Sequence, residues 1–163
     1  MTENLTGDDI INIAIGIERR GISFYDVMAK SADDEVSRGI FEALVGMERE
    51  HLEIFQNMLD DVDSSGTINV IDDKRSDYLR TLIDSAVFTD ELITSEMAAQ
   101  ADTDIKAMEL GITAEKDSLL FYYEIKDSLP DEMIPLIDRI IAEEKMHLQQ
   151  LAAIKKKLAE ESF

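Results

Sequence analysis

The two halves of the chain repeat one arrangement of chemically active residues. Each half has a glutamate that is followed at the same offset by a Phe-Tyr pair, and later by a Glu-x-x-His motif at nearly equal spacing. The repeated residues are Glu18, Phe24, Tyr25, Glu48 and His51 in the first half, and Glu115, Phe121, Tyr122, Glu144 and His147 in the second. Such self-similarity indicates a weak internal duplication, so we expect both halves to fold alike.

The composition is typical of a single folded domain that spans residues 1–163. With 45% hydrophobic and 32% charged residues, a chain of this length can bury one core. It has no cysteine, which excludes disulfides, iron–sulfur clusters, zinc ribbons and thiol nucleophiles. The net charge of -20 disfavours nucleic acid and anionic membranes as partners. Residues 1–9 do not resemble an export signal and no apolar run could span a bilayer, so we expect a soluble, cytoplasmic protein.

The apolar spacing predicts an all-α chain, beginning with two long helices. Thr6 and Asp9 form a capping box, which predicts a helix over 8–30. Ser31 and Asp34 repeat that signal and predict a second helix that reaches residue 60.

A polar segment then separates this pair of helices from a second pair. Residues 61–73 are rich in Asp, Ser and Gly, which predicts a loop. Apolar spacing over 78–83 predicts a short helix that continues weakly to residue 93. Long helices are expected again over 103–128 and 131–160, with Pro135 in the first turn of the last one.

This order of helices predicts a four-helix bundle made of two helical hairpins. Short connections join the helices within each pair, whereas a connection of roughly 40 residues separates the pairs, enough for a crossover along the bundle. Two hairpins with a long crossover that contains a short helix are typical of the ferritin-like arrangement.

Each of the four long helices is expected to direct one glutamate into the core. Residues three or four apart lie on one face of a helix. Glu48 and His51 continue an apolar stripe that includes Phe41 and Phe55, and the other helices carry their glutamates in equivalent stripes. The predicted inward residues are Glu18, Glu48, His51, Glu115, Glu144 and His147.

Four ionised carboxylates in the core of a small domain require neutralisation. No lysine or arginine lies on the inward stripes, whereas two divalent cations would balance four carboxylates and two neutral imidazoles. One glutamate from each of two helices and Glu-x-x-His from each of the other two is the ligand pattern of di-iron carboxylate bundles. Oxygen and nitrogen ligands without thiolate suit iron or manganese. The sequence therefore predicts a dinuclear metal site.

Two tyrosines extend the predicted metal site by one layer. Tyr25 and Tyr122 follow Glu18 and Glu115 on the same helix faces. Their hydroxyl groups could donate hydrogen bonds to ligand carboxylates, as outer-sphere groups in metal sites commonly do. The alternative is that they are core residues whose hydroxyls have other partners.

A second metal signal lies in the segment 61–72, which is similar to an EF-hand calcium loop. Asp61, Asp63 and Gly66 stand at the usual first, third and sixth positions. The twelfth position carries Asp72 where a longer bidentate glutamate is usual. A polar crossover loop remains the alternative interpretation.

The four helices resemble the rubrerythrin-like branch of the ferritin-like di-iron carboxylate superfamily. Segments 17–25 and 115–122 are similar to its first and third helices, and segments 48–51 and 144–147 to its ligand motifs on the second and fourth. The resemblance implies a non-haem di-iron, or di-manganese, oxidoreductase that reduces peroxide or oxygen or oxidises ferrous iron. The metal and catalytic residues would be Glu18, Glu48, His51, Glu115, Glu144 and His147, with Tyr25 and Tyr122 behind them.

The chain departs from the family pattern at one position that bears on its activity. Rubrerythrins usually carry a further glutamate one turn after the third-helix ligand, and this chain has Ser118 there. Because the sequence has no cysteine for a rubredoxin-type iron site, we expect electrons from a separate donor protein, with a small oxidant such as peroxide or oxygen as the substrate. The alternative is a non-catalytic metal-binding or iron-handling protein.

We expect the protein to form a homodimer, because the long crossover could let two chains exchange hairpins. Light scattering at micromolar concentration checks this expectation. A single species of 18.4 kDa would contradict it.

Overall fold

Capping residues determine where the first helices begin. The computed structural model describes residues 3–65, 70–86 and 103–162. Helix α1 covers Gly7–Ser31, and its capping box is present: Thr6 Oγ1 accepts a hydrogen bond from Asp9 N at 3.2 Å, and Asp9 Oδ2 accepts one from Thr6 N at 2.8 Å. Helix α2 covers Glu35–Ser65 and is capped by Asp34, which accepts a hydrogen bond from Ser37 N at 2.8 Å, and not by Ser31.

Helix α2 is longer than its sequence predicts. Its backbone remains helical through residues 61–65, where the sequence predicts a loop. The first five positions of the calcium-loop motif are therefore helical, and Asp72 caps the following helix by accepting a hydrogen bond from Arg75 N at 3.1 Å. Residues 66–69 lie outside the described part. An EF-hand loop must wrap its ligands around an ion, which a helix cannot do. The predictions of a loop, and of an EF-hand-like loop, are therefore both wrong for residues 61–65.

The remaining helices agree with the expected order. Helix α3 covers Asp73–Asp84, so the short crossover helix is confirmed, while its weak continuation over 87–93 lies outside the described residues. Helix α5 covers Asp104–Lys126 and begins after the capping residue Thr103. A 3₁₀ turn, η1, over Asp131–Met133 leads into α6, which covers Ile134–Glu161 with Pro135 in its first turn.

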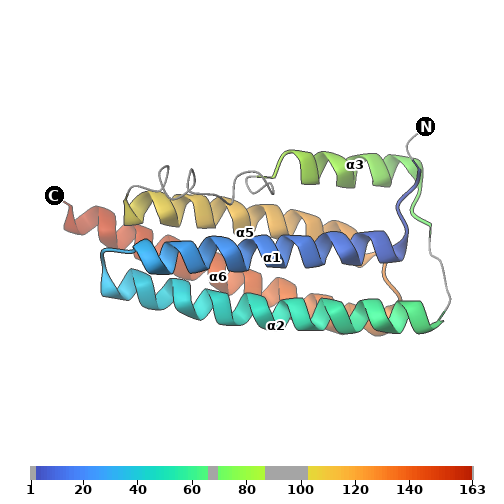
Figure 1. Ribbon diagram of the computed structural model, residues 1–163. Helices are drawn as coiled ribbons and strands as arrows, with labels where there is room; N and C mark the ends of the chain where they lie inside the picture. The colour runs from blue at the N-terminus through green and yellow to red at the C-terminus, as the bar shows by residue number, and fades with distance from the viewer. Residues whose placement is uncertain (1–2, 66–69, 87–102, 163) are drawn as a thin grey trace.

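The long helices form a bundle of two antiparallel hairpins (Figure 1). Helix α1 packs along α2, and α5 packs along α6, while α1 also contacts α5 and α2 contacts α6. Helices α2 and α5 run in the same direction, so the chain must return along the bundle between them. Helix α3 lies outside the bundle against α5 on this return path. The all-α, ferritin-like arrangement is thus confirmed.

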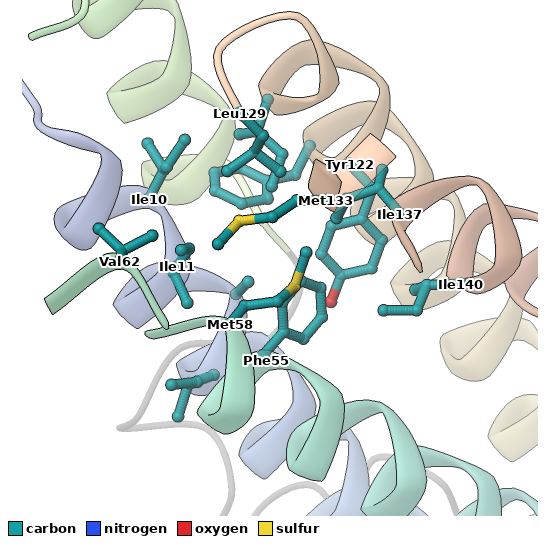
Figure 2. Close-up of a cluster of buried hydrophobic side chains, with 14 of the residues drawn as sticks. Ile10, Ile11, Phe55, Met58, Val62, Tyr122, Leu129, Met133, Ile137 and Ile140 are labelled. Atoms are coloured by element: carbon teal, nitrogen blue, oxygen red, sulfur yellow. The ribbon is translucent and has the colours of Figure 1, made fainter. Parts of the chain in front are cut away.

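Two apolar clusters fill the bundle on either side of its middle. The cluster in Figure 2 is built around residues such as Ile11, Phe55, Met58, Leu129 and Ile137. The second cluster contains Phe24, Met28, Phe41, Met108 and Leu151. Among helices in the described ranges, none is both long and apolar enough to cross a membrane.

Candidate metal centre

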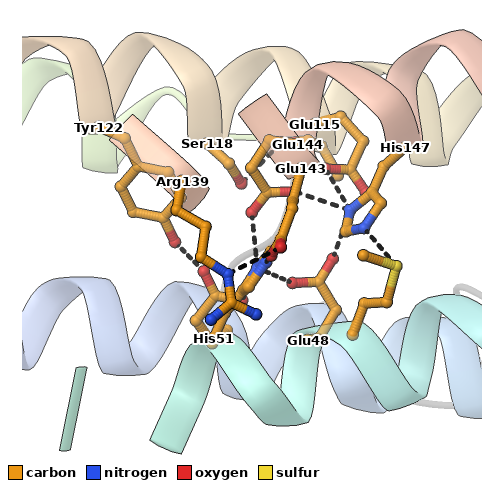
Figure 3. Close-up of polar contacts among 12 residues, drawn as sticks. Glu48, His51, Glu115, Ser118, Tyr122, Arg139, Glu143, Glu144 and His147 are labelled. Atoms are coloured by element: carbon orange, nitrogen blue, oxygen red, sulfur yellow. Dashed lines mark hydrogen bonds and ion pairs between the residues drawn. The ribbon is translucent and has the colours of Figure 1, made fainter. Parts of the chain in front are cut away.

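A layer of charged side chains lies between the two apolar clusters. The four inward glutamates predicted from sequence are buried, with at most 4% of their surface exposed, and both histidines are fully buried. The residues of this layer are Glu18, Glu48, His51, Glu115, Glu144 and His147. Each long helix contributes to the layer because its glutamate occupies a core position of the helical repeat. Figure 3 shows Glu48, Glu115 and Glu144 directed toward one another from three of these helices.

The layer divides into two overlapping groups of potential metal ligands. One group contains Glu18, Glu48, His51 and Glu144, and the other contains Glu48, Glu115, Glu144 and His147. Within each group, one ligand atom from every residue lies within 4.8 Å of all the others. Glu48 and Glu144 belong to both groups, so their two oxygens can each face a different ion. This is the sharing that a dinuclear centre requires.

The Nδ1 atom of His51 lies at distances from three carboxylates that suit ligands of one cation. Its Nδ1 atom lies 3.6 Å from Glu18 Oε2, 3.4 Å from Glu48 Oε2 and 3.3 Å from Glu144 Oε1. Ligands held about 2.0–2.2 Å from one ion at angles of 90–109° are separated from one another by about 2.8–3.6 Å. Within the described residues, His51 Nδ1 and Glu18 Oε2 are buried without a hydrogen-bond partner. Unpartnered buried polar atoms are costly, and a shared cation would satisfy both.

The second histidine has similar surroundings but a tighter contact. His147 Nδ1 lies 2.8 Å from Glu144 Oε2, 3.5 Å from Glu48 Oε1 and 3.7 Å from Glu115 Oε2. The two imidazole rings are stacked, with centroids 5.6 Å apart. The donor set of four carboxylates and two imidazoles therefore fits two hard or borderline divalent ions such as iron or manganese.

Two tyrosines hold carboxylates of the opposite hairpin. The Tyr25 hydroxyl on α1 donates a hydrogen bond to Glu115 Oε1 on α5, and the Tyr122 hydroxyl on α5 donates one to Glu18 Oε1 on α1. Both rings are buried in apolar clusters, Tyr122 beside Phe55 with centroids 5.3 Å apart. These bonds orient the two carboxylates and tie the hairpins together. Of the two alternatives that the sequence allowed for these hydroxyls, the hydrogen bonds to carboxylates are the ones present.

The electrostatics of the layer favour protonation of several of its groups when no cation is present. Burial raises the pKa of Glu18 well above its usual range, and the charge of Glu48 adds to this. Burial likewise raises the pKa of Glu115, together with the charge of Glu144. Burial alone would raise the pKa of Glu48, but contacts with Glu18 and both histidines outweigh it and lower that pKa.

Both histidines hold their protons unusually tightly in the same state. Burial alone would lower the pKa of His51, but the surrounding carboxylates raise it far above its usual value. The pKa of His147 rises to about 12 for the same reason, although burial opposes the shift. Metal binding must therefore displace protons from this layer.

The Nε2 atoms of the two histidines, which point away from the carboxylate layer, have different partners. His51 Nε2 lies 2.8 Å from Glu143 Oε2, and Arg139 Nε donates a hydrogen bond to Glu143 Oε1 at 2.9 Å. Burial alone would raise the pKa of Glu143, but Arg139 and His51 lower it, so this carboxylate stays ionised. His147 Nε2 instead lies 3.3 Å from Met47 Sδ. Glu143, Arg139 and Met47 are not among the residues predicted from the sequence. Alignment of the two halves nevertheless places Met47 and Glu143 at matching positions directly before the motifs.

A small cavity of about 40 Å³ reaches the layer between α1, α3 and α5. One water molecule needs roughly 10–15 Å³ of such space, so about three water-sized molecules fit. Its wall includes Glu18, Glu48 and Glu115 together with Gly21 and Ser118. Gly21 and Ser118 stand one turn after Glu18 and Glu115, so these two small residues leave the carboxylates accessible from the cavity.

The bundle and its buried layer define the class of protein to which this chain belongs. A ferritin-like helical bundle with four inward glutamates and two Glu-x-x-His motifs is the architecture of the di-iron carboxylate proteins. The chain belongs to the Rubrerythrin family, whose family model matches residues 9–155. The predicted family resemblance is therefore confirmed.

A solved structure supports the same class. The chain is similar to a protein from Thermotoga maritima that is provisionally described as a ferritin-like diiron-carboxylate protein. The two share 28% sequence identity and a TM-score of 0.75, and the similarity covers 96% of this chain and 98% of that one. No curated protein is significantly similar in sequence.

We expect the metal-free protein to lose stability as the pH rises from about 6.5 to 9. A group whose pKa is raised by folding, such as His147 at about 12, stabilises the fold fully below its unfolded pKa of about 6.5 and progressively less above it. The raised pKa of Glu18 and Glu115 acts in the same direction. The lowered pKa of Glu48 acts oppositely, but only near and below its unfolded pKa of about 4.3.

Thermal melts of chelated and metal-loaded protein check this expectation. The melting temperature of the chelated form should fall across the range, while that of the loaded form should change less, because cations replace the protons. Equal melting temperatures for the two forms at every pH would contradict it.

Proposed function

We propose that the protein is a non-haem di-iron oxidoreductase that reduces peroxide or oxygen, with manganese as the alternative metal. The observation that carries this proposal is the pair of overlapping ligand groups that share Glu48 and Glu144. A small cavity reaches three of the carboxylates, those of Glu18, Glu48 and Glu115, which favours a small oxidant as substrate. Bound iron would supply redox chemistry in which each of two ions contributes one electron.

The proposed ligands divide between two metal positions. Glu18 and His51 would hold one ion and Glu115 and His147 the other, with Glu48 and Glu144 bridging both. Hydrogen bonds from Tyr122 and Tyr25 would keep Glu18 and Glu115 oriented as ligands. The apolar clusters above and below the layer exclude bulk water, which strengthens the electrostatic interactions within it.

The proposal includes partners outside the chain. Reduction of peroxide to water consumes two electrons, and we propose that they come from a separate donor protein. We further propose that the protein acts in the cytoplasm, as a homodimer.

Oxidation of ferrous iron at the same centre is a second candidate activity, favoured by the net charge of -20, which attracts cations. Repeated turnover of peroxide with an added reductant would separate a peroxidase from a protein that only holds iron.

We expect His51→Ala and His147→Ala each to lose about one of two irons per chain and most of the reactivity with peroxide. The reason is that a two-electron step needs both ions. Apoprotein is loaded anaerobically with ferrous iron, iron per chain is measured by elemental analysis, and oxidation by peroxide is followed by absorption spectroscopy. Retention of two irons and full reactivity in both variants would exclude the proposed centre.

We expect a larger side chain at residue 118 to slow oxidation without removing metal. Ser118 Oγ donates a hydrogen bond to Ala114 O at 3.1 Å, so it is not needed as a ligand. Ser118→Leu should fill the cavity and lower the single-turnover rate by about tenfold, or about 1.4 kcal/mol in the barrier. Ser118→Ala is the matched control and should keep both the iron content and the rate. Equal rates in the two variants would show that peroxide does not use this cavity.

A further inference from the structure

The internal duplication is broken at the residue directly before each Glu-x-x-His motif. Met47 precedes Glu48, and Glu143 precedes Glu144. Each of these two residues contacts the histidine of the other half across the bundle. Figure 3 shows this contact for Glu143 and His51. The two histidines therefore have equivalent positions but chemically different neighbours.

The neighbour of His51 is an anchored carboxylate. Glu143 Oε2 lies 2.8 Å from His51 Nε2, and its other oxygen accepts the hydrogen bond from Arg139. A carboxylate that accepts from one ring nitrogen fixes the imidazole so that its other nitrogen serves as the ligand, and it makes that nitrogen a stronger donor to metal. This outer carboxylate also adds a negative charge near the bound cation.

The neighbour of His147 is a thioether, which provides none of this support. Met47 Sδ lies 3.3 Å from His147 Nε2. A thioether sulfur is a weak, uncharged acceptor, so it neither fixes the ring strongly nor strengthens its donor nitrogen.

The Nδ1 atoms of the two histidines, which face the carboxylates, also differ in their contacts. His51 Nδ1 is buried without a hydrogen-bond partner and lies 3.3–3.6 Å from three carboxylate oxygens, so a cation that takes the place of its proton would not break a hydrogen bond there. His147 Nδ1 is instead hydrogen-bonded to Glu144 Oε2 at 2.8 Å, and a cation would have to replace this hydrogen bond. Two independent observations thus favour the His51 position.

We propose that the two metal positions are inequivalent and fill in order, the His51 position first, with Glu143 as the positioning residue that sets the order. This inference rests on the proposed dinuclear centre. At limiting metal the protein would hold one ion in the His51 position and lack the second ion that a two-electron step requires. Supply of the second, weakly held ion would therefore regulate the activity.

Binding of Mn²⁺ alone tests the order without depending on turnover. Calorimetric titration of the apoprotein should resolve two binding constants that differ by about 10–100-fold, which is the usual effect of an outer-sphere partner on metal affinity. Crystals of the protein with one equivalent of Mn²⁺, examined by anomalous scattering, should show the ion beside His51. Equal occupancy of the two positions, or an ion only beside His147, would overturn the inference.

Exchange of the two neighbours supplies the decisive variants. Glu143→Met should lower the first binding constant about 10–100-fold toward the second, and Met47→Glu should raise the second. Glu143→Gln keeps the size of the side chain and removes its charge, and serves if Glu143→Met does not fold; it should lower the first constant as well. An unchanged first constant in a folded Glu143 variant would overturn the inference.

A nearby charge provides the matched control. Glu50 also lies near Arg139, 3.5 Å from its Nη2 atom, but no contact with either histidine is present among the described residues. Glu50→Gln removes one negative charge, as Glu143→Gln does, and should leave both Mn²⁺ binding constants and their order unchanged. If it lowers the first binding constant as much as Glu143→Gln does, charge alone, and not the contact with His51, sets the order. A parent protein that binds neither Mn²⁺ nor, under anaerobic conditions, Fe²⁺ would overturn the dinuclear centre itself, together with the inference.

Discussion

The burial of four carboxylates in one layer is the constraint on which the rest of the structure depends. Two charges 4 Å apart interact by about 4 kcal/mol at an effective dielectric constant of 20, and a domain of this size is stable by only about 5–15 kcal/mol. Several such repulsions could not be sustained together. Arg139 contacts Glu143 and Glu50 at the edge of the layer. The layer therefore requires protons or metal ions.

The apolar clusters and the hairpin arrangement position this layer. Each long helix buries a stripe of side chains and inserts its glutamate about halfway, so that the carboxylates meet only when all four helices are packed. The hydrogen bonds of Tyr25 and Tyr122 cross between the hairpins in opposite directions. The buried layer and hairpin packing are thus coupled, because each hairpin supplies a carboxylate that a tyrosine of the other one orients.

The duplication explains why the site is nearly symmetric, and its exceptions indicate where the two halves have separate roles. Gly21 and Ser118 occupy matching positions and both line the cavity, so neither half provides a further carboxylate there. Met47 and Glu143 also occupy matching positions but differ in charge. The first pair borders the cavity, and the second pair contacts the two histidines.

The sequence by itself determined the all-α class, the hairpin pairing and the six inward residues. It could do so because helical periodicity and motif spacing are local properties, and buried glutamates within apolar stripes are rarely tolerated without a ligand. The predicted end of α2 at residue 60 was wrong. Residues 61–65 are polar and turn-forming, but they continue an existing helix. Only the tertiary structure decided which atoms meet across helices: Tyr25 with Glu115, Tyr122 with Glu18, and Glu143 with His51. These contacts join residues far apart in the chain and depend on the rotation and register of packed helices, which no single helix encodes.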